Sequence, residues 1–132
     1  MTNKKYFFPA LLAGLFIILV LLTIPGGYFY GSYTDWLSQH VRLAETIRGA
    51  CLEQGTLAPA FLPLGGGSNG YQFSYYGYLR PDILIGCLFP SVPMVYFLVG
   101  YMLAGYFCSV MLCYCWLLKH TQDRGSAFLG SL

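Results

Sequence analysis

The chain has 132 residues, of which 57% are hydrophobic, 18% are aromatic and only 9% are charged. A soluble domain carries about 25% charged residues, so the surface of this chain could not face water on all sides. Together with the long apolar runs, this composition predicts a membrane protein. The net charge of +2 is too small to indicate a nucleic acid as partner, and no nucleic-acid-binding motif is present in the sequence.

The five cysteines do not form a recognisable metal or redox motif, because no two of them have the Cys-x-x-Cys spacing. Cys108, Cys113 and Cys115 fall inside an apolar run, where cysteine behaves as a small hydrophobic residue. Cys51 and Cys87 could pair if their region is extracytoplasmic, and the sequence leaves this question open.

A first membrane-spanning helix is expected over residues 6–24, which carry no charge and follow a short polar start at residues 1–5. At 1.5 Å per residue this run is about 28 Å long, close to the thickness of a bilayer core. Pro9 suits a first helical turn, and Pro25 ends the helix. A cleaved signal peptide is the main alternative, but its core would be rather long and no small-x-small cleavage site follows it. A retained anchor is therefore favoured.

An amphipathic helix is expected over about residues 34–54. Apolar residues recur there at spacings of three and four and build one stripe, formed by Leu37, Val41, Ala44, Ile47 and Cys51. The opposite face is polar and carries Asp35, Gln39, Arg42, Thr46 and Glu53. Ser32 followed by Asp35 matches a helix-capping pattern, and Gly55 ends the helix. Such a helix would lie in the membrane interface with its apolar side toward the lipid.

Residues 55–81 are expected to form a loop without a regular element, because prolines and glycines interrupt the whole stretch. The alternating aromatic residues near its end suggest a strand, but a lone strand would have no partner. An uncharged run follows, and two prolines divide it into a short interfacial helix over 82–90 and a second membrane span over 93–118. Residues 119–132 are then a polar tail.

The positive-inside rule places both ends of the chain in the cytoplasm, because Lys4, Lys5, Lys119 and Arg124 flank the two spans. The loop of residues 25–92 is then extracytoplasmic, and its length indicates that it carries function. The predicted fold is all-α and integral to the membrane, with two transmembrane helices joined by a large extracytoplasmic loop that contains an amphipathic interfacial helix. Because two helices bury little of each other, we expect them to dock on further membrane helices.

Three stretches resemble the amino-terminal region of the YfhO family of bacterial membrane proteins. They are Thr34–His40 (TDWLSQH), Phe61–Gly77 (FLPLGGGSNGYQFSYYG), and Leu79–Pro81 (LRP) with the apolar run after it. The resemblance covers about residues 6–120. It implies a polytopic glycosyltransferase of the GT-C type in the bacterial plasma membrane, which moves a sugar from a polyprenyl-phosphate carrier to a cell-wall polymer such as a teichoic acid. Because members of the family are several times longer, it also implies an amino-terminal fragment that is inactive alone.

The resemblance gives Asp35 the role of the essential acid in the first extracytoplasmic loop, as a catalytic base or as an acid linked to a metal ion. The spacing alone favours the other interpretation, an acid that stabilises a helix N-terminus. Gln39, one turn further, could orient Asp35 or bind a sugar hydroxyl, or it is an ordinary solvated polar residue. Arg42 could meet the phosphate of the carrier, or it forms a surface pair with a glutamate.

Arg80 has the same two interpretations as Arg42, with lipid headgroups as a third. Tyr75 and Tyr76 could stack on a sugar, or they belong to an interfacial aromatic belt. No metal site is predicted, since His40 has no clustered acids or thiols around it. No cofactor is assigned, although a divalent cation could be held by Asp35 together with acids from segments outside this chain.

The enzyme interpretation implies as partners the lipid bilayer, the polyprenyl-phosphate sugar, the polymer acceptor and the remaining transmembrane helices of the parent protein. Two other functions stay open. One is a non-catalytic two-span membrane subunit whose outer loop binds a partner protein or lipid. The other is a fragment of a transporter, which is less favoured because neither span contains an ionisable residue.

Overall fold

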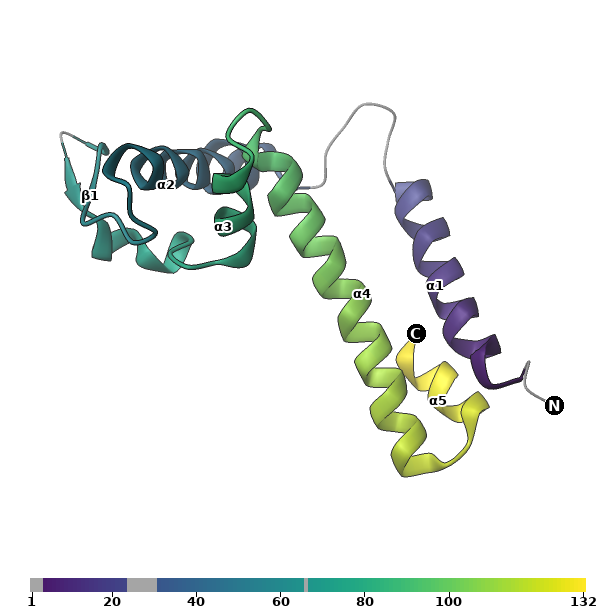
Figure 1. Cartoon of the computed structure of the whole chain (residues 1–132). Coiled ribbons are helices and arrows are strands. Elements are labelled where there is room, and N and C mark those ends of the chain that lie inside the picture. Colours follow the sequence, from purple (N-terminus) through teal and green to yellow (C-terminus); the bar gives the residue numbers. More distant parts are fainter. Residues whose placement is uncertain (1–3, 24–30, 66) are drawn as a thin grey trace. The chain divides into compact units, whose positions relative to one another are not determined.

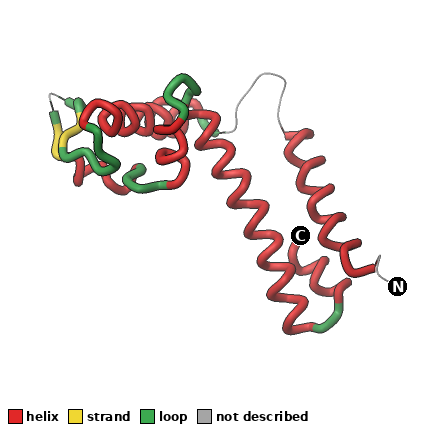
Figure 2. Tube along the Cα trace, viewed as in Figure 1, coloured by secondary structure: helices red, strands yellow, loops and turns green. Residues whose placement is uncertain are grey.

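A computed structural model of the chain describes residues 4–23, 31–65 and 67–132, and helices dominate these ranges (Figures 1 and 2). The described residues form two compact units. We call residues 4–23 with 102–132 the span unit and residues 31–101 the loop unit. The elements in chain order are α1 (Lys4–Thr23), η1 (Tyr33–His40), α2 (Val41–Gln54), β1 (Phe61–Leu62), β2 (Ser68–Asn69), η2 (Gly70–Tyr76), α3 (Pro81–Leu88), α4 (Met94–Thr121) and α5 (Arg124–Ser131).

Two helices are long and apolar enough to cross a membrane, namely Tyr6–Thr23 within α1 and the whole of α4. Only 6% of each segment is buried inside the molecule, so most of its apolar side chains face outward. Both helices coincide with the expected spans, although α4 continues to Thr121 because Lys119 and His120 suit the last turn of a helix. Pro25, which was expected to end the first helix, lies outside the described residues.

The span unit contains a helix, α5, that the sequence did not predict, because residues 119–132 were expected to be a tail. Asp123 caps this helix, since its Oδ2 atom accepts a hydrogen bond of 2.7 Å from the backbone N–H of Ser126. The ring of Phe128 on α5 lies 5.4 Å from that of Phe8 on α1. The buried core that joins the three helices consists of Leu12, Tyr114 and Ala127.

The loop unit begins with a π-helix, η1, the type of helix in which backbone N–H groups bond to carbonyls five residues earlier. The N–H of Leu37 bonds to the carbonyl of Ser32 at 3.1 Å, and that of Val41 bonds to the carbonyl of Trp36. The helix then continues directly as α2. Gly55 ends α2 in the left-handed conformation with φ of 63°, which confirms the predicted C-terminus.

The apolar stripe of the predicted helix is buried only in its second part. Ala44, Ile47 and Cys51 lie in the core of the loop unit, whereas Leu37 is 37% exposed. The stripe assumed α-helical spacing, and the wider turn of η1 rotates the residues before Val41 away from it. The buried face of α2 covers this unit's own core, so it is not the free apolar side that was expected to face lipid. The position of the helix in the membrane interface stays a prediction. The fully buried core comprises Ala44, Ile47, Ala50, Cys51, Leu62, Ile83, Met94 and Leu98.

The stretch expected to lack regular structure contains a small antiparallel hairpin, so that expectation is wrong. Strand β1 pairs with β2, with Phe61 opposite Asn69, beside the C-terminal end of α2 (Figure 1). Gly65 and Gly67 have φ of 54° and 106° and permit the tight turn between the strands. Pro63 follows the paired residues of β1, so it removes no hydrogen bond from the ladder.

The aromatic residues after the hairpin form a short 3₁₀-helix, η2, and not a strand. Its first turn is capped by Asn69, whose Oδ1 atom accepts a hydrogen bond of 2.9 Å from the N–H of Tyr71. Just beyond η2, the hydroxyl of Tyr78 donates a hydrogen bond to the carbonyl of Pro59. These two bonds fold the stretch back onto the hairpin.

The start of α4 is fixed to α2 by an ion pair that also bonds to the backbone. Glu45 and Arg48 pair on α2. Arg48 donates a hydrogen bond of 2.6 Å to the carbonyl of Val92, and Glu45 accepts one of 2.7 Å from the N–H of Met94. The short helix α3, which ends at Leu88 and not at residue 90, packs on the same face of α2.

Candidate functional site

Asp35 lies in the first turn of η1, and its backbone is held by the cap of that helix. The Oγ atom of Ser32 accepts hydrogen bonds from the N–H groups of Asp35 at 3.1 Å and of Trp36 at 3.4 Å, which confirms the predicted capping pattern. The Asp35 side chain is exposed, and within the described ranges its carboxylate has no hydrogen bond or ion pair. An unpaired, solvated carboxylate is free to accept a proton or bind a cation.

Gln39 joins η1 to η2, which are far apart in the sequence. Its Nε2 atom donates a short hydrogen bond to the hydroxyl of Tyr76. The ring of His40 lies 5.5 Å from the Tyr76 ring and 6.0 Å from the Trp36 ring. The helices η1 and η2 therefore meet through the rings of Trp36, His40 and Tyr76, which we call the aromatic row. The Gln39 amide is bonded to this row through the Tyr76 hydroxyl.

Tyr75 extends this aromatic row toward solvent. Its ring lies 4.2 Å from the ring of Tyr76, and the residue is 73% exposed. A hydrogen bond with the Tyr76 hydroxyl raises the pKa of Tyr75 above its ordinary value of 10.0. Exposed aromatic rings beside an amide can stack on a flat apolar face of a ligand while the amide bonds to its hydroxyl groups.

Arg80 is held by three groups of the loop unit. Its guanidinium donates two hydrogen bonds to Asp82, from Nε at 3.1 Å and from Nη2 at 2.5 Å, and a third of 3.2 Å to the carbonyl of Tyr76. It also lies over the ring of Tyr101 at 5.9 Å. The Asp82 side chain is fully buried, so Arg80 compensates its charge. Most donors of Arg80 are thereby used within the protein.

Arg42 lies apart from the aromatic row, on the wall of a groove along η1 and α2. The groove has a volume of about 370 Å³ and is lined by Leu37, Val41, Arg42, Glu45 and Thr46. The glutamate of this region pairs with Arg48 and not with Arg42, so the expected surface pair of Arg42 is wrong. Within the described part of the chain no acid pairs with Arg42.

The structure thus connects four of the six candidate residues and leaves two separate. Tyr76 is the centre, because it contacts Gln39, Tyr75 and Arg80. No hydrogen bond, ion pair or ring contact between described residues links Asp35 to this group, and none links Arg42 to it. The roles predicted for these residues stay predictions.

Two residues near the site were missed by the analysis of the sequence. His40 was considered only as a metal ligand, but it is part of the aromatic row. Asp82 was not singled out, although a buried acid two residues after an arginine and directly after a proline can start a helix and pair with that arginine. The position of Asp82 after Arg80 and Pro81 was therefore a usable signal, whereas no local pattern indicates the ring contacts of His40.

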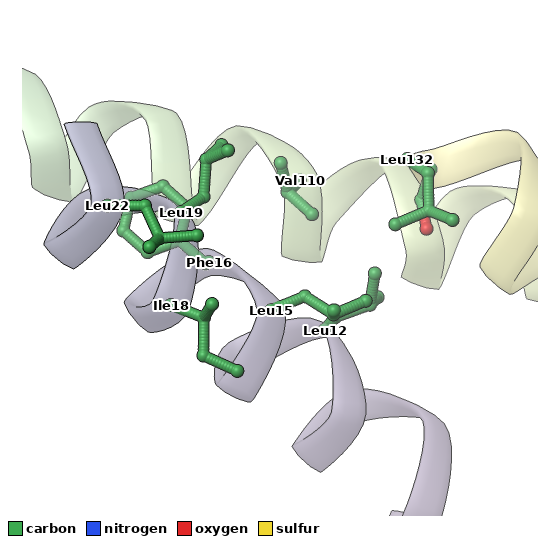
Figure 3. A pocket seen from close by; sticks show the side chains of 9 residues that line it. Leu12, Leu15, Phe16, Ile18, Leu19, Leu22, Val110 and Leu132 are labelled. Carbon is green, nitrogen blue, oxygen red and sulfur yellow. The ribbon is translucent and has the colours of Figure 1, made fainter.

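The span unit contains a second hollow, which is apolar. It has a volume of about 310 Å³, and Figure 3 shows side chains of α1 on one side with Val110 of α4 and Leu132, the residue after α5, on the other. Its lining residues are Leu12, Leu15, Phe16, Ile18, Leu19, Leu22, Val110, Ser131 and Leu132. A hollow of this lining offers no group for acid–base chemistry.

Within the described ranges, no three histidine, cysteine, aspartate or glutamate side chains gather into a group that could hold a metal ion. Comparison of the chain with protein-family models, with curated proteins and with solved structures gave no match. The function is therefore argued from the residues of the loop unit and from the two helices of membrane-spanning length.

Proposed function

We propose that this chain is part of a membrane glycosyltransferase of the GT-C type, and that the loop unit forms its extracytoplasmic face. The observation that carries the proposal is the combination of a held backbone and an exposed carboxylate at Asp35. Its backbone is fixed by Ser32, while its carboxylate is exposed and unpaired within the described ranges. A catalytic base needs a free lone pair, which the unpaired carboxylate offers, and the capped backbone limits the region that this carboxylate can reach.

In this proposal Asp35 takes the proton from the attacking hydroxyl of the acceptor, or holds a divalent cation together with acids of other segments. The acceptor is a cell-wall polymer and the donor is a sugar on a polyprenyl phosphate. The exposed ring of Tyr75 and the Gln39–Tyr76 pair offer a stacking surface and an amide to a sugar.

The two arginines contribute differently to the proposed site. Arg42 is the better candidate for the carrier phosphate, since it lines an open groove and pairs with no acid among the described residues. Arg80 is committed to Asp82 and to the carbonyl of Tyr76, so its contribution is to hold the aromatic row in place.

The test is the replacement Asp35→Asn in the membranes of cells that produce the protein, with sugar transfer to the acceptor polymer as the readout. We expect transfer to be lost while the amount of protein in the membrane is unchanged. Glu53→Gln is the matched control, because Glu53 is an exposed acid near the end of α2, and it should leave transfer intact. Full transfer by the Asp35→Asn protein would exclude the catalytic role.

A second function is favoured by the outward-facing apolar surface of the two spans, of which only 6% is buried. A non-catalytic subunit that docks on other membrane helices, and whose outer loop binds a partner protein or lipid, would have such a surface. In that case Asp35→Asn would be tolerated, and the protein would co-purify with a partner after mild detergent extraction. The same replacement therefore distinguishes the two functions.

A further inference from the structure

The loop unit places two cysteines from different helices in the same core. Cys51 lies in the last turn of α2 and is 5% exposed, and Cys87 lies in the last turn of α3 and packs against the core that contains Cys51. The Sγ atom of Cys51 donates a hydrogen bond of 3.7 Å to the carbonyl of Leu57, and Cys87 is close enough to contribute to the raised pKa of the Cys51 thiol. Two cysteines packed in one core at the ends of neighbouring helices are placed to form a bond with an S–S distance of about 2.05 Å.

We propose that Cys51 and Cys87 form a disulfide that fastens α3 to α2 when the protein meets a disulfide oxidant. The other three cysteines, Cys108, Cys113 and Cys115, belong to α4 in the span unit. The proposal does not depend on glycosyl transfer, since it concerns only the contact between the two helices.

The environments of the two thiols determine the order of the reaction. Burial, and then the neighbouring Cys87, raises the pKa of Cys51 to about 11 from an ordinary value of 9.0. Its thiolate fraction near pH 8 is thus about 100-fold smaller than that of a free thiol. Cys87 is half-buried and accessible from outside, so it reacts first.

The oxidant is a small-molecule or protein disulfide, and the reaction is thiol–disulfide exchange. The Cys87 thiolate attacks the external disulfide, forms a mixed disulfide and releases one external thiol. The Cys51 thiolate then attacks the Cys87 sulfur, forms the internal bond and releases the second external thiol. Two protein thiols are oxidised, one external disulfide is reduced to two thiols, and the two protons pass to the released thiols.

The bond would close the chain between residues 51 and 87, a segment that contains the hairpin and η2. Closing a segment of this length restricts the unfolded chain and thereby stabilises the folded one. Tyr75 and Tyr76 of η2 lie within the closed segment, so the disulfide would also restrict the movement of η2 relative to α2.

The test uses the full chain in detergent micelles, with the three cysteines of α4 replaced by serine so that only the proposed pair is present. The reduced protein is treated with oxidised glutathione at pH 8, quenched with acid, denatured and exposed to N-ethylmaleimide. We expect an intact mass that is two hydrogens lower, with neither maleimide nor glutathione attached, and a melting temperature several degrees above that of the reduced protein.

Two variants in this background test the order of reaction and act as controls. Cys51→Ser should trap one glutathione on Cys87, because no second thiol can release it. Cys87→Ser should stay largely unmodified, because the buried Cys51 thiol reacts slowly. The proposal is wrong if the two-cysteine protein still binds two maleimides after oxidation, if it carries two glutathiones, or if its only product is a cross-linked dimer.

Discussion

Glu45 on α2 accepts a hydrogen bond of 2.7 Å from the backbone N–H of Met94, the first residue of α4. The first N–H groups of a helix have no partner within that helix, so the carboxylate satisfies one of them. The same side chain pairs with Arg48, which holds the carbonyl of Val92. This arrangement fixes the start of a membrane-length helix to the core of the loop unit, and the first prediction concerns its removal.

Replacing Glu45 with alanine should destabilise the loop unit by about 2–3 kcal/mol, because it leaves the largely buried Arg48 without its acid and the Met94 N–H without its acceptor. Glu53→Ala on the same helix removes an exposed acid and should change stability by less than about 0.5 kcal/mol. Denaturant unfolding of the two variants in detergent measures the difference. Equal stabilities would show that the carboxylate of Glu45 does not hold the start of α4.

Asp82→Asn should be costly, because the Asp82 carboxylate is fully buried and its two oxygens both bond to Arg80. We expect a loss of about 2–3 kcal/mol, somewhat below the range for fully buried pairs because Arg80 is one-third exposed. The exposed Asp35→Asn change should cost less than about 1 kcal/mol. Thermal unfolding compares them, and an Asp35→Asn protein as unstable as Asp82→Asn would make the functional test of Asp35 uninformative.

Replacing two helical glycines with alanine, one at a time, should change the stability of the protein in opposite directions. A Cβ atom on Gly86 of α3 would lie 2.4 Å from the sulfur of the fully buried Met94, so overpacking should cost about 1–3 kcal/mol. A Cβ atom on Gly49 of α2 would meet nothing within 4 Å, so alanine should stabilise that helix by about 0.5–1 kcal/mol. Melting temperatures that shift in the same direction would contradict the close packing of Gly86 of α3 against Met94 of α4.

The stability of the loop unit should fall as the pH rises from about 9 to about 11. The pKa of Cys51 is about 11 in the folded chain against 9.0 for an ordinary thiol. Between these two values the unfolded chain loses the Cys51 proton while the folded chain still holds it, so the free energy of unfolding falls over that interval. The full effect is up to about 3 kcal/mol. Burial also raises the pKa of Tyr78, so the measurement is the difference from a Cys51→Ser variant, whose unfolding curve should depend less on pH.

Helix α5 should unfold locally in acid. Hydrogen bonds from the side chain and the backbone of Ser126 hold the pKa of Asp123 below its usual 3.8. The stabilising effect of the ionised cap is therefore complete above pH 3.8 and is lost as the pH falls through the lower value of the folded chain. The contact between the rings of Phe8 and Phe128, followed by NMR, should weaken in that range. Asp123→Ala should abolish this pH dependence, and an unchanged acid transition would assign it to another group.

Local signals predicted much of the fold. The two uncharged runs predicted the long helices, and Ser32 and Gly55 marked where the helical segment between them begins and ends. These features depend on residues close in sequence. The π-helical turns could not be predicted in this way, because no residue type specifies an i−5 hydrogen bond and the expected stripe assumed regular spacing.

The site was predicted less completely, because its contacts are distant in sequence. Gln39 and Tyr76 are separated by 37 positions, and no periodicity brings them together. The sequence also does not show which arginine pairs with Glu45, because Arg42 and Arg48 both lie within one helical turn of it. Only the folded chain shows that Arg48 is the one that reaches the backbone before α4.

The π-helical turns of η1 allow this segment to absorb a change of length. Removing one residue between Asp35 and Val41 would let the N–H groups and carbonyls that flank the deletion pair at the α-helical interval of four residues in place of five. Because the same groups stay paired, the residues before the deletion would keep roughly their direction about the axis of α2. A chain that lost a single residue here would keep both its fold and the side of the helix on which its exposed acid lies.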